Sequence, residues 1–209
     1  MKTKNIRNKF IELYKNKEFN DEGLLEIIGA SFIADEDSIF GTPNLDYIAK
    51  EIAWYNSKSR NIYDMDNPPK IWRDIASKEG NINSNYGWCI YSKENYNQYY
   101  EVLIKLQKNI HTRQATMIYT RPTMHNDSTC DGMYDFMCTN AVIYRYSKGK
   151  LNAIVQMRSN DAVFGYKNDY AWQKTVLHIL CSTLGITPGV IHWQIASLHI
   201  YPRHFNLVC

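Results

Sequence analysis

Residues 135–161 have the sequence DFMCTNAVIYRYSKGKLNAIVQMRSND, and this stretch decides the architecture of the second half of the chain. Two runs rich in β-branched and aromatic residues, Phe136–Tyr146 and Leu151–Ser159, flank the polar, glycine-containing segment Ser147–Lys150. This pattern predicts two antiparallel strands joined by a short turn.

A symmetric turn places Cys138 opposite Ser159, to within one or two positions, and therefore near Arg158. A single cysteine in a strand is more often a small core residue. A guanidinium nearby favours the thiolate, however, and an Arg–Ser pair suits a phosphate. Both interpretations of Cys138, core residue and nucleophile, are open on this pattern alone.

Downstream of the hairpin the pattern predicts a helix and a last strand. The helix begins at Asn168-Asp169 and ends at Gly185, with apolar residues at helical spacing between them. In the strand, Val190–Tyr201, alternation puts Ser197, His199 and Tyr201 on one face. Asp169 is interpreted as a helix cap or as a functional carboxylate, and His199 and Tyr201 as hydrogen-bonded core residues or as ligands.

Upstream of the hairpin the chain alternates between helical and strand patterns. An amphipathic helix is expected over residues 4–18, and one or two strands over Leu24–Gly41. A helix after Pro43-Asn44 has Leu45, Ile48, Ile52 and Tyr55 on one stripe, with Glu51 at its margin. Glu51 therefore belongs either to a solvated face or to a partly buried site.

The middle of the chain is predicted to contain short elements and loops. Loops are expected over Lys58–Pro69 and Gly80–Gly87, a helix around Glu94–Lys108 and a strand at Ala115–Thr120. Together with the hairpin, these elements predict an α+β fold with a mixed sheet packed against helices. A chain of 209 residues is long enough for one sizeable domain, and we expect one covering 1–209.

Composition narrows the possible partners. The net charge is +3 and no long run of Lys or Arg occurs, which favours a small anionic ligand over a nucleic acid. No apolar stretch approaches the length of a membrane span, and the basic start lacks a signal-peptide core, so a cytoplasmic protein is expected. Five cysteines without a C-x-x-C pair suggest free thiols and no cysteine metal site.

Taken together, the order and spacing of these residues resemble the thymidylate synthase superfamily. The resemblance rests on Cys138, Arg158-Ser159-Asn160-Asp161, Gly165, Asn168-Asp169 and His199-Ile200-Tyr201, and covers residue 24 to the end. Longer segments resemble its deoxycytidylate hydroxymethylase branch from T-even-type phages: EIIGASF at 26–32, INSNYGW at 82–88, MIYTRP at 117–122, DFMCTN at 135–140, MRSND at 157–161 and NDYAWQK at 168–174. Matches of this length are far more specific than a short motif.

The resemblance implies a thymidylate synthase-like fold and a folate-dependent reaction at C5 of a pyrimidine nucleotide. Cys138 would add to C6, the activated C5 would take up the methylene group of 5,10-methylenetetrahydrofolate, and water would complete the hydroxymethyl group. Thr139 stands where synthases usually have histidine, as in the hydroxymethylase branch. The implied activity is conversion of dCMP to 5-hydroxymethyl-dCMP, without a metal.

The resemblance also assigns roles to individual residues. Glu51, in the setting Glu51-Ile52-Ala53-Trp54, matches the catalytic glutamate, and Asp169 stands where synthases have the asparagine that pairs with uracil. The implied nucleotide-binding residues are Arg158, Ser159, Asn168, His199, Tyr201 and Tyr86. Asp161 and Trp72 match folate-binding positions, although Trp72 and Tyr86 are equally compatible with core packing.

The superfamily forms homodimers in which arginines of the partner reach the phosphate, and Arg113 matches the first of them. Gln114 replaces the second arginine, and the chain ends soon after His204-Phe205, where relatives continue, so we expect a domain that is short at its C-terminus. The resemblance is compatible with a phage nucleotide-synthesis complex. Alternatives are a thymidylate synthase or dUMP hydroxymethylase, or an inactive relative retained for binding or assembly.

Overall fold

The hairpin predicted from residues 135–161 is present in the computed structural model, which describes all 209 residues. Strand β3 spans Thr139–Ser147 and β4 spans Lys150–Asp161. The turn residues Lys148 and Gly149 both have positive φ, 51° and 79°, as a two-residue type I′ turn requires. Strand β3 begins three residues later than predicted, so Cys138 lies immediately before the strand.

The chain divides into two compact units. Unit 1 consists of Met1–Asn44 and Ile143–Cys209, and unit 2 of Leu45–Val142. Strand β3 contributes its first residues to unit 2 and the rest to unit 1.

Unit 1 contains a mixed sheet with the strand order β1-β5-β4-β3. β1 (Leu25–Ala34) pairs antiparallel with β5 (Thr187–Ile200), and β5 pairs parallel with β4. The parallel pair requires a crossover, which is provided by α7 (Gly165–Leu184). This unit confirms the α+β class and the mixed sheet.

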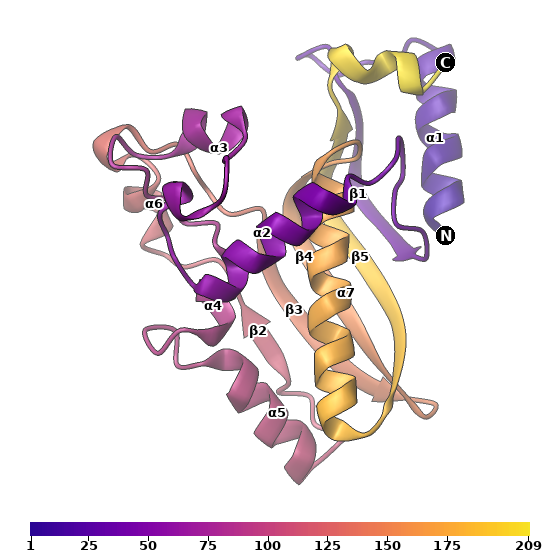
Figure 1. The fold of residues 1–209 in the computed structure, drawn as a ribbon. Coiled ribbons are helices and arrows are strands. Elements are labelled where there is room, and N and C mark those ends of the chain that lie inside the picture. The colour runs from indigo at the N-terminus through magenta and orange to yellow at the C-terminus, as the bar shows by residue number, and fades with distance from the viewer. The chain divides into compact units, whose positions relative to one another are not determined.

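Helix α7 packs on one face of this sheet against β4 and β5, and α1 (Thr3–Lys15) packs beside β1 (Figure 1). The side chains of β4 that face the helix, Leu151, Ala153, Val155 and Met157, are buried, whereas those between them are half-buried or exposed. Ring contacts of Phe205 with Tyr14 and Phe19 hold the last helical turns, η3 (Pro202–Leu207), against α1.

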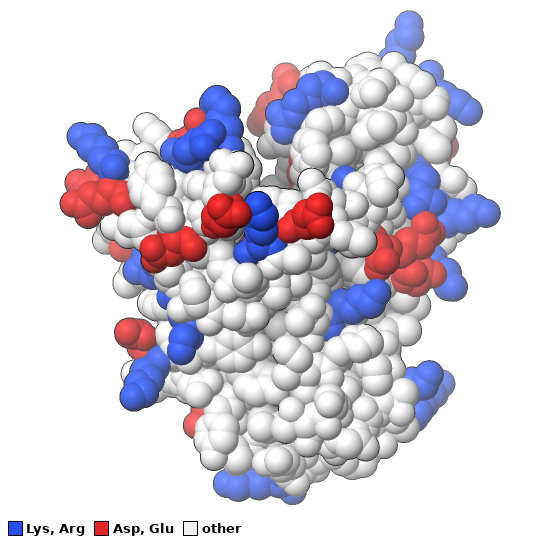
Figure 2. Space-filling view, viewed as in Figure 1, with Lys and Arg blue, Asp and Glu red and all other residues white.

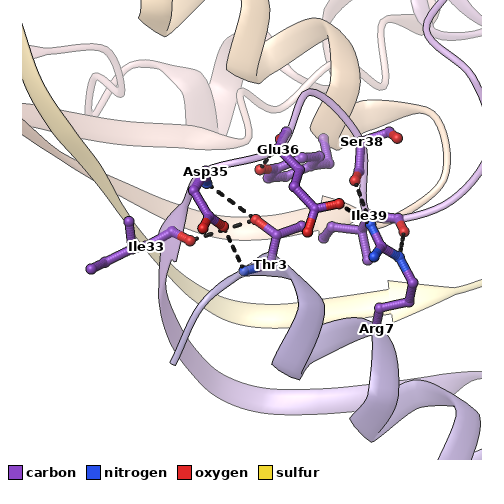
Figure 3. Close-up of polar contacts among 8 residues, drawn as sticks. Thr3, Arg7, Ile33, Asp35, Glu36, Ser38 and Ile39 are labelled. Carbon is purple, nitrogen blue, oxygen red and sulfur yellow. Dashed lines mark hydrogen bonds and ion pairs between the residues drawn. The ribbon is translucent and has the colours of Figure 1, made fainter.

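Polar bonds attach α1 to the chain after β1 (Figure 3). The Thr3 amide donates to Asp35 Oδ1 over 3.1 Å, and the Asp35 amide donates to Thr3 Oγ1 over 3.2 Å. Arg7 donates to the carbonyl of Ile39 over 2.6 Å and forms an ion pair with Glu36. Ser38–Gly41 is consequently an irregular connection held by side chains, and Leu24–Gly41 contains one strand.

Unit 2 is built from short elements. These are α2 (Leu45–Ser57), η1 (Ile62–Asp64), α3 (Lys70–Ile75), α4 (Tyr86–Tyr91), α5 (Gln98–Lys108), β2 (Thr116–Ile118), α6 (Met124–Asp127) and η2 (Cys130–Gly132). Helix α4 packs against α2 and α5, and α5 packs beside β2. At the α2–α4 contact, a Cβ on Gly87 would lie 1.8 Å from the carbonyl oxygen of Tyr55, so only glycine fits there.

The structure corrects several predicted boundaries. Helix α7 begins at Gly165, three residues before the predicted start at Asn168. Residues 165–167 form its first turn, so Asp169 lies inside the helix and does not cap it. The stripe predicted for α2 is displaced: Leu45 is 73% exposed, whereas Glu51, Trp54 and Tyr55 are buried. Helix α4 begins inside the predicted loop Gly80–Gly87 and ends before the predicted helix Glu94–Lys108; Asn85 caps it by accepting from the Trp88 amide.

None of the helices combines the length and the apolar character needed to cross a bilayer. On the face shown in Figure 2, basic and acidic side chains are interspersed. None of the five cysteines forms a disulfide.

Candidate functional site

In unit 1, the predicted nucleotide-binding residues gather at the carboxyl ends of two parallel strands. Pairing of β4 with β5 places Ser159 opposite Ser197 and Asp161 opposite His199. Helix α7 begins four residues after Asp161, so its first turn lies beside these strand ends. The carboxyl edge of parallel strands is where open α/β sheets bind ligands.

Asp169 is held by a chain of two hydrogen bonds. The side-chain amide of Asn160 donates to Asp169 Oδ2 over 2.8 Å, and the Trp193 indole donates to Asn160 Oδ1 over 3.2 Å. Because the indole can only donate, it fixes which end of the amide faces Asp169. Asn160 is 2% exposed, whereas Asp169 is half-buried. The Asp169 carboxylate is therefore oriented by a buried partner and is still reachable from solvent.

His199 and Tyr201 lie together, as predicted, although Tyr201 follows the end of β5. Their rings meet edge to face at 5.0 Å, and Ser197 Oγ lies 3.5 Å from His199 Nδ1. Ser197 also donates to Glu26, and this bond together with one from Asn20 lowers the pKa of the Glu26 carboxyl. The arrangement leaves an imidazole and a phenol side by side at the strand end.

Asp161 uses one carboxylate oxygen for the backbone: Oδ1 accepts from the Val163 amide over 2.8 Å. Two basic groups, Lys167 and His204, interact electrostatically with the Asp161 carboxylate. Burial lowers the pKa of both, and Lys167 donates to the carbonyl of Thr42 over 3.2 Å. Of the remaining predicted residues of unit 1, Arg158 is exposed and Asn168 half-buried.

In unit 2, Glu51 is 4% exposed, so it does not lie on a solvated face. The hydroxyl of Tyr47, one helical turn earlier in α2, donates to Glu51 Oε1 over 2.7 Å. The indole of Trp72 donates in turn to the Tyr47 oxygen over 2.9 Å. Trp72 thus reaches the predicted catalytic carboxylate through a tyrosine that sequence reasoning did not identify.

Cys138 is half-buried at the entry to β3. The next residue, Thr139, is fully buried and donates through its hydroxyl to the phenol oxygen of Tyr86 over 3.0 Å. The Tyr86 ring stacks on Tyr55 with centroids 5.2 Å apart and is 4% exposed. Tyr86 therefore supports the segment that carries Cys138, and Arg113 lies exposed elsewhere in unit 2.

The predicted pairing of Cys138 with Ser159 joins residues of different units and stays a prediction. A cavity of about 740 Å³ in unit 1 lies near the hairpin turn and is lined by Arg145, Lys150, His192 and neighbouring residues. It contains none of the predicted site residues. No group of three or more His, Cys, Asp or Glu side chains in the chain is arranged to hold a metal ion.

Sequence reasoning missed two residues of the site. Asn160 was part of the motif MRSND but received no role, and its burial depends on the distant Trp193. Tyr47 had a local signal, because it lies four residues before Glu51 on the same helix and side chains at this spacing meet.

Comparison with known proteins identifies the family of the chain. A family model described as thymidylate synthase matches residues 42–209. Deoxycytidylate 5-hydroxymethyltransferase of Enterobacteria phage T4 is 53% identical over 192 residues, which are 88% of this chain and 78% of the relative. The enzyme of the same name from Enterobacteria phage T2 matches equally. Thymidylate synthase of Francisella philomiragia is 25% identical over 172 residues, 77% of this chain and 63% of the relative.

Proposed function

The chain belongs to the thymidylate synthase family, and from this premise we propose that it is a deoxycytidylate 5-hydroxymethyltransferase. It converts dCMP, methylenetetrahydrofolate and water to 5-hydroxymethyl-dCMP and tetrahydrofolate. The high identity to the phage T4 and T2 enzymes of that name supports the activity. Because these relatives come from phages, we propose that the protein acts in the cytoplasm of an infected cell. A phage nucleotide-synthesis complex is a candidate partner there.

Cys138 is the nucleophile in this proposal. The thiolate adds to C6 of the cytosine, which makes C5 nucleophilic, and its departure at the end restores the 5,6 double bond. Between these steps C5 loses its hydrogen as a proton. The half-buried position of Cys138 supports this role, because the sulfur is reachable while its flanking residue Thr139 is fixed.

Glu51 holds the water that becomes the hydroxyl group and takes its proton. The hydrogen bond from Tyr47 to Oε1 fixes the direction of this buried carboxylate, as a group that orders water and takes up its proton requires. Trp72 and Tyr47 set this direction from below.

The single observation that carries the choice of substrate is the hydrogen bond from Asn160 to Asp169. This bond holds the half-buried carboxylate in place, and a carboxylate oxygen accepts from the C4 amino group of cytosine. If protonated, the same group also donates to the unprotonated N3. Uracil presents a carbonyl at C4 and would place two acceptors against each other.

The remaining polar residues bind the sugar and phosphate. We assign the phosphate to Arg158 and Ser159, and the sugar hydroxyl to His199 and Tyr201, with Asn168 and Tyr86 completing the nucleotide site. The edge-to-face pair of His199 and Tyr201 supports this, since both present a polar tip at the strand end.

Asp161 and Trp72 are the candidates for folate contacts. Methylenetetrahydrofolate supplies the one-carbon unit when bound. Asp161 fits such a ligand, because its Oδ2 is free to accept from N–H groups of a pterin while Oδ1 is held by Val163. The half-buried indole of Trp72 offers an apolar face.

Release of tritium from [5-³H]dCMP tests the proposed function directly. Wild-type protein should release tritium only when methylenetetrahydrofolate is present, and 5-hydroxymethyl-dCMP should accumulate in equal amount. Release from labelled dUMP with formation of thymidylate would support a synthase instead. No release from either nucleotide would refute the enzymatic assignment.

We further propose a homodimer in which Arg113 of one subunit serves the phosphate bound to the other. Two neighbouring strands of unit 1 carry exposed apolar side chains, Ile28 of β1 and Val190 of β5, and such residues support contact with a second subunit. Mixing Arg113→Ala with Cys138→Ala subunits should restore activity, because one site of the mixed dimer then has both residues. If the subunits exchange and no activity returns, the shared site is wrong.

A further inference from the structure

A buried aspartate that the proposed chemistry does not use lies three residues before Cys138. Asp135 is 4% exposed, and its carboxylate accepts hydrogen bonds from residues 83 and 84. The backbone amides of Asn83 and Ser84 donate to Oδ2, each over 2.7 Å, and the Ser84 hydroxyl donates to Oδ1 over 2.6 Å. A carboxylate with these donors is fixed in position and direction.

The side chain of Asn83 also bonds back to the segment that contains Asp135. Its amide donates to the carbonyl of Asp135 over 3.1 Å and lies 3.5 Å from the sulfur of Met133. Residues 133–135 are therefore attached through both backbone and side chain to residues 83–84. Asn83 is completely buried, so water does not replace these bonds.

Two arginines hold Asn83 from the other side. Arg60 and Arg121 each donate to Asn83 Oδ1, over 2.8 and 3.0 Å, and both guanidiniums stack on Trp88. Neither forms an ion pair with a carboxylate. Two cations that share a neutral acceptor favour a negative charge nearby. Arg60 is attracted electrostatically by Asp127 and, more weakly, by Asp135, and of these two carboxylates Asp135 is the buried one.

Residues 83–86 contact the chain on both sides of Cys138. Asn83 and Ser84 hold Asp135 before it, and Tyr86 holds Thr139 after it. We propose that Asp135 is a positioning residue for the Cys138 nucleophile, acting through Asn83, Ser84 and Tyr86, which we call the clamp. This inference rests on the proposed function of Cys138.

The clamp has a chemical purpose. Addition to C6 requires the sulfur to approach the face of the ring along a narrow path, and misplacement by about 1 Å can cost about 10²-fold in rate. Cys138 lies directly before the first residue of β3. The clamp fixes the chain on both sides of it, through Asp135 and through Thr139.

Asp135→Asn tests the clamp, since it keeps the shape of the side chain but turns one acceptor into a donor facing N–H groups. We expect kcat to fall about 10²-fold while the Kd for dCMP, measured without folate, stays unchanged. Asp131→Asn is the matched control, because Asp131 is exposed in the same segment, and it should leave kcat unchanged. An unchanged kcat in folded Asp135→Asn overturns the proposal, as does a parallel loss of kcat, dCMP binding and Tm.

Ser84→Ala removes the hydroxyl that donates to Asp135 Oδ1. This variant keeps the inference testable if Asp135→Asn does not fold. It should reduce kcat about tenfold, again with dCMP binding retained, and wild-type kcat would contradict the clamp. Amide hydrogen exchange distinguishes failure of the clamp from failure of the proposed function. Faster exchange at residues 133–140 in Ser84→Ala than in the wild type, with α5 unchanged, supports the clamp. Absence of tritium release from dCMP by the wild-type protein would refute only the proposed function.

Discussion

The polar cluster of unit 1 is built on long regular elements, whereas that of unit 2 is built on short ones. Asn160, Asp169 and Trp193 belong to a strand of 12 residues, a helix of 20 and a strand of 14. Glu51, Tyr86 and Cys138 depend on a helix of 13 residues, one of 6 and a segment before a strand. Side-chain hydrogen bonds orient both sets, but the first set stands on backbone fixed by long regular elements, whereas the second stands on short or irregular segments.

This difference suggests a division of tasks. Unit 1 carries most of the residues that we propose bind the nucleotide, for which the rigid edge of a sheet is suited. Unit 2 presents the proposed nucleophile and general base, whose positions are set by individual side chains. Substitutions in unit 1 should therefore change which substrate is used, and those in unit 2 how fast it reacts.

The largest effect is expected for Cys138→Ala in unit 2. Turnover should fall to background because no group remains to add to C6, while binding of dCMP stays measurable by calorimetry. Single replacement of Cys89, Cys130, Cys181 or Cys209 by serine or alanine should preserve turnover. Appreciable tritium release from [5-³H]dCMP by Cys138→Ala would contradict the assignment of Cys138 as the nucleophile.

Asp169→Asn in unit 1 should move the substrate preference from dCMP toward dUMP. The new amide can still accept from Asn160 through its oxygen, and its NH2 group then faces the ligand and matches the C4 carbonyl of uracil. Unpaired polar groups in such sites discriminate by about 10⁴. The ratio of kcat/KM for the two nucleotides measures the change, and an unchanged ratio would assign specificity elsewhere.

Gly87→Ala tests how far unit 2 depends on close packing of short helices. Its Cβ would lie 1.8 Å from the Tyr55 carbonyl oxygen, so α2 and α4 must separate, and we expect a loss of about 3 kcal/mol in unfolding free energy. Gly149→Ala in the turn of unit 1 meets no atom within 4 Å and should cost only about 1 kcal/mol, from its positive φ. Urea unfolding compares the two, and equal losses would contradict the distinction.

Tyr47→Phe removes the hydroxyl between Trp72 and Glu51. We expect kcat to fall about tenfold, equivalent to about 1.4 kcal/mol, because Glu51 loses the bond that directs it. The preference between dCMP and dUMP should not change. Tyr100→Phe, at an exposed position of α5, is the control and should behave as wild type. A changed preference in Tyr47→Phe would contradict the division between the units.

The smallest effect is expected at Glu26, at the edge of the unit 1 cluster. Hydrogen bonds from Ser197 and Asn20 lower its pKa in the folded state. The stabilisation is therefore present above the unfolded value of about 4.3 and is lost as pH falls through the folded value. Glu26→Gln should lower Tm slightly at pH 7 and not at pH 3, and an equal effect at both would exclude the carboxylate charge as the cause.

Local patterns in the sequence were sufficient for the elements of unit 1. The alternation in Leu151–Ser159, the turn at Lys148-Gly149 and the apolar spacing before Gly185 each depend on neighbours a few residues apart. The motif around Cys138 and the carboxylate at 169 could be recognised in the same way. In unit 2 the predictions were weaker, and α4 was missed because its cap and its glycine contact lie within a segment rich in loop-forming residues.

Tertiary structure alone decided which side chains meet. Asn160 reaches Trp193 across 33 positions and Asp135 reaches Ser84 across 51. A bond over such a separation leaves no periodic trace, because its partners are brought together by packing of elements that each form for their own local reasons. The sequence alone therefore determined which residues are candidates for the chemistry, whereas the side chains that orient these candidates depend on burial and on contacts that only the folded chain creates.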